Sequence, residues 1–273
     1  MGVFPPPAPF VVATDVDATT WIDERLQPFG RLGEGTLVGE IVPSGFEAYA
    51  RVFHPARRFF GPSIEQRATL RWSEIAAARN KAVHPQMQIE ALIDKADAFD
   101  YDHWKAISSG EGDWSPPYEE LEETDAMALL SLLRPFTATP NDGWFMLWDG
   151  YGDLGPEIDP LPRAMIHPDR TGTPLLPELE GRTLAFRHYL VFRGPFDGLG
   201  EWYRWRGEGP NYWWPADRAW LVVTEIDGFS TYVGASSAGI EAVLASPLVE
   251  ALPSALSLRF DVWGDTVNGP PPM

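Results

Sequence analysis

Hydrophobic and polar residues alternate in several short stretches of the chain, and β-branched residues are frequent there, as expected of strands. On this pattern we predict strands over Phe10–Asp17, Phe46–Phe53, Gly143–Trp148, Thr183–Phe192, Ala219–Ile226 and Ser230–Val233. Residues 143–148 are apolar on both faces, which favours a central strand. Asp227-Gly228 separates the last two strands and is a dipeptide typical of hairpin turns, so these two strands should pair.

Helices are fewer in this pattern than strands. We predict them over Glu74–Arg79, Glu90–Asp97 and Glu119–Leu133, and from Ser237 to Pro247. Ser73 is the expected N-cap of the first helix, and Asn80 is its expected left-handed stop. The third begins with glutamates that suit the helix dipole and ends before Pro135. Two long segments, Gly150–Pro177 and Phe196–Asp217, are predicted to be loops.

Strands mostly follow strands along the chain, and this order favours an antiparallel or mixed sheet over alternating βαβ units. We therefore predict an α+β fold with a mostly antiparallel or mixed sheet, a few short helices, and long loops rich in aromatic residues and proline. A chain of 273 residues fits one globular domain over 1–273. The pattern leaves open a weak subdivision near 135–142.

The chain contains no cysteine, which excludes disulfides, thiolate metal sites and cysteine nucleophiles. Residues 1–10 include four prolines and no basic residue, so we expect no secretory signal there. The sequence also lacks an apolar run of the roughly 18 residues that a membrane helix requires. We therefore expect a cytoplasmic protein that does not enter the membrane.

The formal net charge is −18, which opposes binding to nucleic-acid phosphates and favours basic partners. Over half of this charge lies in residues 90–125, where twelve acidic side chains accompany two lysines. Five aromatic residues are interleaved with them: Phe99, Tyr101, Trp104, Trp114 and Tyr118. A solvated loop and a docking surface for a basic protein both fit this composition.

The docking surface is our first functional hypothesis, for a non-enzymatic protein that binds a basic protein partner. In it, carboxylates steer the partner and aromatic rings anchor it. The residues that we assign to this surface are Trp104, Trp114, Tyr118, Glu119, Glu120, Glu122 and Glu123. Steering of this kind predicts an association that weakens strongly with added salt.

No complete catalytic or cofactor motif is present, so we assign no catalytic residue, metal ligand or cofactor. The run from Gly234 to Ala238 lacks the final glycine of a nucleophile elbow, and no histidine follows it. Its serines, Ser236 and Ser237, are instead the expected N-cap of the last helix. The alternative hypothesis is a metal-assisted hydrolase that gathers carboxylates and histidines from distant loops, including Asp149, Asp153, His167 and Asp169.

Two further groups of residues are expected to be structural. Six aromatic residues crowd residues 202–214, and we favour their packing in the core over an exposed binding platform. His54 precedes a proline, and we expect it to be hydrogen-bonded at a strand-to-loop corner. We expect Trp220 to fill the core beside the Asp227-Gly228 hairpin.

Two longer segments carry a family likeness. They are Gly45-Phe-Glu-Ala-Tyr-Ala-Arg-Val-Phe-His54-Pro and Asn211-Tyr-Trp-Trp-Pro-Ala-Asp-Arg-Ala-Trp220. With shorter segments in the same order, they resemble a family of actinobacterial conserved hypothetical proteins, a likeness that implies kinship without an activity. The acidic balance and many aromatic residues also resemble, at the level of fold alone, the SUKH superfamily of α+β interaction and toxin-immunity proteins. That analogy implies a binding role, with a basic toxin or nuclease as the partner.

Overall fold

The computed structural model describes residues 5–14, 16–28, 36–59, 67–92, 113–115, 117–166 and 187–269. Its strands are β1 (Val11–Val12), β2 (Ala48–Phe53), β3 (Ala56–Phe59), β4 (Arg67–Leu70), β5 (Asp113–Ser115), β6 (Gly143–Trp148), β7 (Ala164–Ile166), β8 (Arg187–Gly194), β9 (Tyr212–Pro215), β10 (Leu221–Thr224), β11 (Ser230–Ala235) and β12 (Ala251–Ser254). Its α-helices are α1 (Thr20–Asp23), α2 (Trp72–Ala78), α3 (Ile89–Leu92), α4 (Glu123–Leu133), α5 (Leu199–Arg206) and α6 (Ser237–Ala245).

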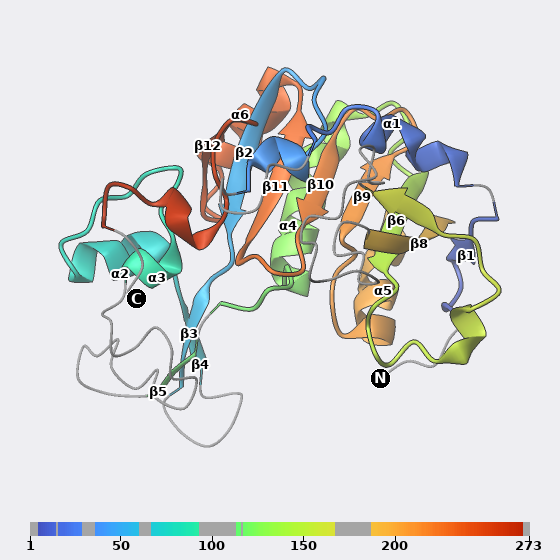
Figure 1. The fold of residues 1–273 in the computed structure, drawn as a ribbon, viewed down its shortest axis with the longest axis horizontal. Helices are drawn as coiled ribbons and strands as arrows, with labels where there is room; N and C mark the ends of the chain where they lie inside the picture. Colours follow the sequence, from blue (N-terminus) through green and yellow to red (C-terminus); the bar gives the residue numbers. More distant parts are fainter. Residues whose placement is uncertain are drawn as a thin grey trace, which may run out of the picture.

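One large antiparallel sheet dominates the described part of the chain (Figure 1). Its strands lie in the order β1-β8-β6-β9-β10-β11-β2-β12, and β7 pairs with the first residues of β8. A small second sheet has the order β4-β3-β5. No helix within the described ranges is long and apolar enough to cross a membrane.

Both faces of the main sheet are apolar, because alternate strand residues point to opposite sides and each side is covered. Phe145 and Val222 belong to a core that includes buried residues of α4, α5 and α6. Met146 and Val223, one position further along the same strands, belong to a second core that includes Trp21 of α1. Strands β6 and β10 are therefore buried on both faces.

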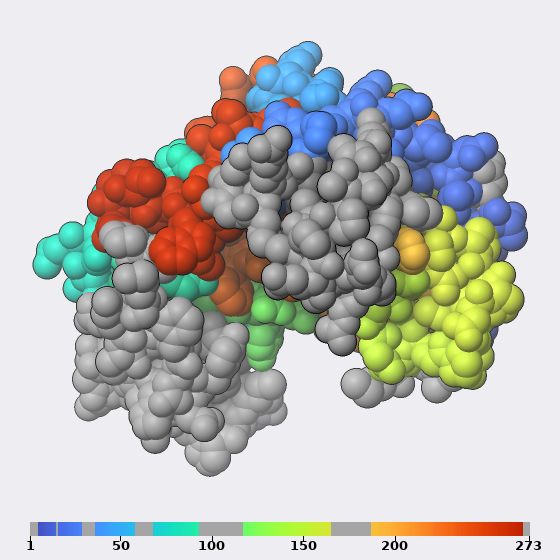
Figure 2. Space-filling model, in the orientation of Figure 1, coloured from blue at the N-terminus to red at the C-terminus, as the bar shows by residue number. Residues whose placement is uncertain are grey.

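The second sheet and the helices α2 and α3 form a smaller lobe that β2 joins to the main sheet (Figure 1). Arg51 of β2 is only 3% exposed, and its guanidinium donates to the carbonyl oxygens of Pro85 and Met87, at 3.2 and 2.9 Å. The C-terminal segment lies against the same lobe (Figure 2), where His84 Nε2 donates to Asp265 Oδ1 at 2.9 Å. Buried polar contacts thus connect the lobe to the rest of the fold.

The α+β prediction is confirmed, and several elements lie where the pattern placed them. The observed β6 coincides with the predicted strand over 143–148 and is central, between β8 and β9. Strands β10 and β11 pair as the predicted hairpin, with Val222 opposite Val233. Asn80 adopts the left-handed backbone expected of a helix stop, with a φ of 53°.

The prediction of a loop over Phe196–Asp217 is wrong, because this segment contains α5 and β9. Leu199 and Trp202 are three residues apart and both fully buried, so they share one inward face of α5. Gly207 ends the helix with a φ of 78°, a left-handed conformation that glycine adopts without a steric penalty. The aromatic residues were therefore a signal of a buried helix and strand.

Two predicted helix starts are also wrong. Helix α2 begins at Trp72 with Arg71 as its N-cap, so Ser73 lies inside the first turn. The carboxylate of Glu74 accepts a hydrogen bond from the Arg71 backbone N–H at 2.7 Å, which satisfies one free donor of this helix end. Helix α4 begins four residues later than predicted, because Glu122 is extended, with a ψ of 151°.

Other predicted elements are only partly present. Among the described residues of the predicted strand over Phe10–Asp17, only Val11–Val12 form a strand, and a 3-10 turn begins at Asp17. The predicted loop Gly150–Pro177 contains the short strand β7. Residues 93–97, 167–177 and 183–186 of the predicted elements lie outside the described residues.

Replacing Ser236 with alanine should lower the free energy of unfolding by about 1 kcal/mol. The Ser236 hydroxyl is the N-cap of α6 and accepts a hydrogen bond from the Gly239 backbone N–H at 3.2 Å. Urea denaturation of the variant and the wild type measures the difference. Equal unfolding midpoints would show that this cap does not stabilise α6.

Candidate functional site

Seven residues make up the predicted docking surface, and the structure does not bring them all together in one site. Trp104 lies outside the described residues, and Trp114 belongs to β5. Glu119 and Glu120 line a common pocket. The remaining three lie in the same segment but do not line this pocket: Tyr118, Glu122 and Glu123.

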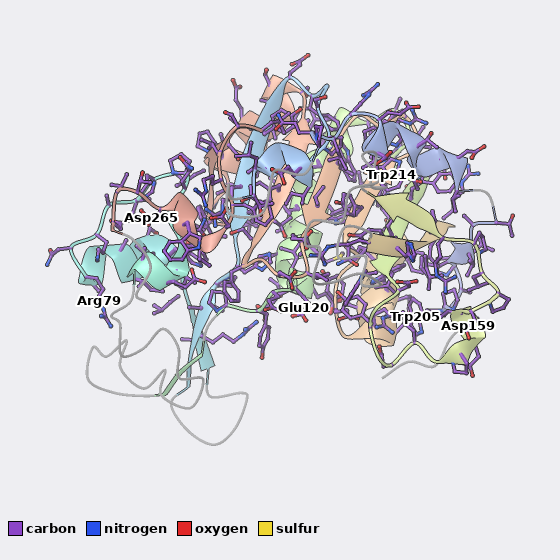
Figure 3. The ribbon with its side chains drawn as sticks, in the orientation of Figure 1. Arg79, Glu120, Asp159, Trp205, Trp214 and Asp265 are labelled. Atoms are coloured by element: carbon purple, nitrogen blue, oxygen red, sulfur yellow. The ribbon has the colours of Figure 1, made fainter. Side chains whose placement is uncertain are left out.

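The pocket has a volume of about 180 Å³ and lies where β6 and β10 end and β9 begins. Four segments line it, with the residues Glu119, Glu120, Trp148, Tyr151, Gly209, Asn211, Thr224, Ile226 and Asp227. Figure 3 shows Glu120 at the end of the main sheet, below α4. Distant segments meet here because β9 pairs with both β6 and β10, which brings the ends of the three strands together.

Two aromatic side chains form one wall of the pocket. The ring centroids of Trp148 and Tyr151 are 5.3 Å apart in an edge-to-face arrangement. Asn211, only 3% exposed, holds this wall, because its Oδ1 accepts a hydrogen bond from the Trp148 backbone N–H at 2.7 Å. Its Nδ2 donates two longer hydrogen bonds of 3.4 Å, to the Tyr151 hydroxyl and the Thr224 carbonyl oxygen. One buried amide thus connects the aromatic wall to β10.

Three carboxylates and no basic side chain line the pocket. Asp227 pairs with Arg187, with 2.7 Å between Asp227 Oδ2 and Arg187 Nη2. Within the described ranges, Glu119 and Glu120 have no ion-pair partner. Partial burial, together with the charges of Asp227 and Glu120, raises the pKa of Glu119 above its usual value. The pocket therefore holds excess negative charge that a bound cation would neutralise.

A chain of hydrogen bonds connects the pocket to His54, which is 1% exposed. His54 Nδ1 donates to the Tyr118 carbonyl oxygen at 2.7 Å, and Nε2 lies 2.8 Å from Thr231 Oγ1. Thr231 Oγ1 in turn lies 2.8 Å from Oγ1 of Thr224, which lines the pocket. The predicted structural role of His54, bonded just after β2, is confirmed. It also anchors the segment that carries Glu119 and Glu120.

Tyr118 and Glu122 make contacts that hold the segment in place. The Glu122 carboxylate pairs with Arg57, whose side chain is fully buried. The Arg57 guanidinium carbon lies 3.2 Å from the centroid of the Tyr118 ring, a cation–π contact. Glu122 is therefore already neutralised by an internal cation. Of the predicted acidic residues, Glu119, Glu120 and Glu123 have no ion-pair partner within the described ranges, and of these Glu119 and Glu120 line the pocket.

Asp125, in the first turn of α4, provides a pH-dependent test of this acidic segment. Burial and the charge of Glu122 raise the pKa of Asp125 to about 6. The folded state therefore disfavours the charged carboxylate, and this cost grows as the pH rises from about 4 to about 6. Replacing Asp125 with asparagine should raise the free energy of unfolding by about 2 kcal/mol at about pH 8 and change it little at about pH 4.

Denaturant titrations at the two pH values measure this difference. The matched control is Asp159→Asn, an exposed aspartate that should show no such pH-dependent gain. A gain of equal size at both pH values for Asp125→Asn would contradict the assignment.

Of the residues named in the metal-assisted hydrolase hypothesis, two pair with arginines and two lie outside the described residues. Asp149 Oδ2 accepts from Arg163 Nε at 2.9 Å, and Asp153 forms an ion pair with Arg206 at 3.0 Å. His167 and Asp169 lie outside the described residues. The described part of the chain contains no group of three or more acidic, histidine or cysteine residues that could hold a metal ion. No observation on these residues favours the hydrolase.

The aromatic residues of 202–214 are part of the core, as favoured from the sequence. Trp202, Trp213 and Trp214 are each at most 1% exposed. Arg206 lies over the Trp205 ring, with 5.5 Å between the guanidinium carbon and the ring centroid. This buried segment also contributes to the pocket, because two of its residues, Gly209 and Asn211, belong to the pocket lining.

Sequence reasoning missed five lining residues that contribute polar or aromatic groups: Trp148, Tyr151, Asn211, Thr224 and Asp227. The sequence predicted the turn at Asp227-Gly228, but it did not indicate that the Asp227 side chain lies beside the acidic segment of Glu119 and Glu120. Trp148 is the last residue of β6 and is only partly buried, and its place at the end of a predicted strand was the available signal. In the comparisons with known proteins, no family model, no curated protein and no solved structure matches this chain.

Proposed function

We propose that the protein is a non-enzymatic binding protein that recognises a basic protein partner through the pocket at Glu119 and Glu120. One observation carries this proposal: two carboxylates that have no ion-pair partner among the described residues lie beside the aromatic wall of Trp148 and Tyr151. Carboxylates attract a cation, and aromatic faces bind its charge and its apolar stem. A cysteine-free chain suits the reducing cytoplasm, where we place this interaction.

The net charge of −18 supports the same proposal from a different direction. A protein with this charge attracts basic molecules over distances of about a Debye length, which speeds their encounter. The electrostatic field of the whole protein brings a basic partner close, but it does not determine where the partner binds. In the proposed interaction, the pocket determines the binding position. A basic toxin or nuclease would have the required charge.

Association with a basic peptide should depend on both salt and the two glutamates. The probe is a labelled peptide of about 12 residues with alternating basic and neutral residues, and its affinity is measured by fluorescence anisotropy. Raising the salt from about 0.02 M to about 0.2 M should weaken binding at least about tenfold. At low salt, the variant Glu119→Gln/Glu120→Gln should bind about tenfold more weakly than the wild type.

The matched control is Glu157→Gln/Glu241→Gln, which changes the net charge equally at two exposed positions outside the pocket lining. It should retain the wild-type affinity within about twofold, since exposed charges far from a contact contribute little. An equal loss in both double variants would mean that net charge alone attracts the peptide, and the pocket would not be the binding site.

A further inference from the structure

The size of the pocket limits what it can hold. Pockets for drug-sized ligands typically measure about 300–1,000 Å³, whereas this one is about 180 Å³. A nucleotide or an oligosaccharide is too large for it. The head group of one side chain is of the right size, so the pocket suits a single residue that projects from a partner.

The carboxylates approach the pocket from two sides. Glu119 and Glu120 belong to the segment before α4, whereas Asp227 belongs to the turn between β10 and β11. A guanidinium presents five N–H donors in a planar fork and can serve acceptors on two sides at once. A lysine ammonium is a compact and strongly hydrated point charge, which matches a single carboxylate better.

The hydrogen bonds that connect His54, Thr231 and Thr224 determine whether the Thr224 hydroxyl donates or accepts. A carbonyl oxygen can only accept, so His54 Nδ1 carries the proton toward Tyr118, and Nε2 must accept from the Thr231 hydroxyl. Thr231 then accepts from Thr224. The Thr224 hydroxyl proton is thereby committed, and its oxygen offers the pocket a further acceptor. Asn211 adds no free donor, because its amide N–H groups are directed to Tyr151 and to the Thr224 carbonyl oxygen.

The geometry points to an arginine side chain of the partner as the occupant of this pocket. Its guanidinium lies between the carboxylates of Glu120 and Asp227 and against the aromatic wall of Trp148 and Tyr151. At Asp227 it uses Oδ1, because Oδ2 already accepts a hydrogen bond from Arg187 Nη2 at 2.7 Å. This inference rests on the proposed function and goes further, because it names the residue type that the pocket selects.

Three peptides that differ at one central position, which is arginine, lysine or citrulline, test this selection by titration calorimetry. Citrulline keeps the planar shape of arginine without its charge. The arginine peptide should bind about tenfold more tightly than each of the other two. Glu120→Gln should remove most of this preference, and the control Glu241→Gln should retain it. Far-UV circular dichroism of each variant checks that it is folded.

The outcomes separate the two proposals. If the arginine and lysine peptides bind equally and both lose affinity in Glu119→Gln/Glu120→Gln, the selection of arginine is wrong and the proposed function stands. If the citrulline peptide binds as tightly as the arginine peptide, charge is not recognised and the inference is also wrong. If no peptide binds at low salt, the proposed function itself fails.

Discussion

Replacing Trp220 with alanine is expected to lower the free energy of unfolding by about 3–5 kcal/mol. Trp220 is fully buried, with ring centroids 5.1 Å from Phe196 and 5.4 Å from Trp213. Its removal leaves a cavity that close-packed neighbours fill only in part. For a chain of this size, the midpoint of thermal unfolding should fall by roughly 10 °C or more.

The matched control is Trp263→Ala, because Trp263 is 50% exposed. This variant should melt within about 2 °C of the wild type, since a surface side chain leaves no cavity. Thermal unfolding followed by circular dichroism compares the three proteins. An unchanged melting temperature for Trp220→Ala would contradict the structural role. The predicted burial of Trp220 is confirmed, although it lies just before β10, at the other end of this strand from the Asp227-Gly228 turn.

Replacing His54 with alanine is expected to cost about 2–4 kcal/mol, because it leaves the Tyr118 carbonyl oxygen without its partner and removes one of the two side-chain hydrogen bonds of the buried Thr231 hydroxyl. The cost should also depend on pH. Burial lowers the pKa of His54 to about 4, from an ordinary value of 6.5. The neutral imidazole therefore stabilises the wild type fully above about pH 6.5, and this contribution declines as the pH falls toward 4.

Urea denaturation at about pH 7.5 and about pH 4.5 measures both effects. His54→Ala should lose more stability relative to the wild type at the higher pH. The control is His188→Ala, a half-buried histidine for which the described residues provide no side-chain hydrogen bond. Since His54 anchors the segment of Glu119 and Glu120, His54→Ala should also weaken binding of the basic peptide. A pH-independent cost would contradict the assignment of a buried neutral imidazole.

The main sheet was predictable in part, where local pattern decides the structure. Residues 143–148 form a strand because all six are compatible with burial on both faces, and the Asp227-Gly228 turn specifies its hairpin. The segment over 196–217 was predicted to be a loop crowded with aromatic residues, whereas burial of Trp202 and Leu199 stabilises α5 there. Tertiary packing decided the structure there, and a single sequence does not display it.

The candidate site was predictable only in its charges. Glu119 and Glu120 stand out in an acidic segment, but their aromatic neighbours come from residues about 30 positions further along the chain. Likewise, the pairing of Glu122 with Arg57 joins positions 65 apart. The pocket contacts follow from the pairing of β9 with β6 and β10, and Arg57 is placed by the pairing of β3 with β4 and β5. Both are non-local features that periodicity does not specify.

The most direct test of the account is to locate the basic peptide on the protein by nuclear magnetic resonance. The chain has 12 tryptophans, and the indole signal of Trp148 can be assigned with the variant Trp148→Phe. Titration with the arginine peptide should shift this indole signal and the backbone amides of Glu119, Glu120 and Asp227 along one saturation curve. The indole signal of the exposed Trp263 should not move. Binding that leaves these four signals unchanged, or shifts others instead, would contradict the assignment of the pocket as the site.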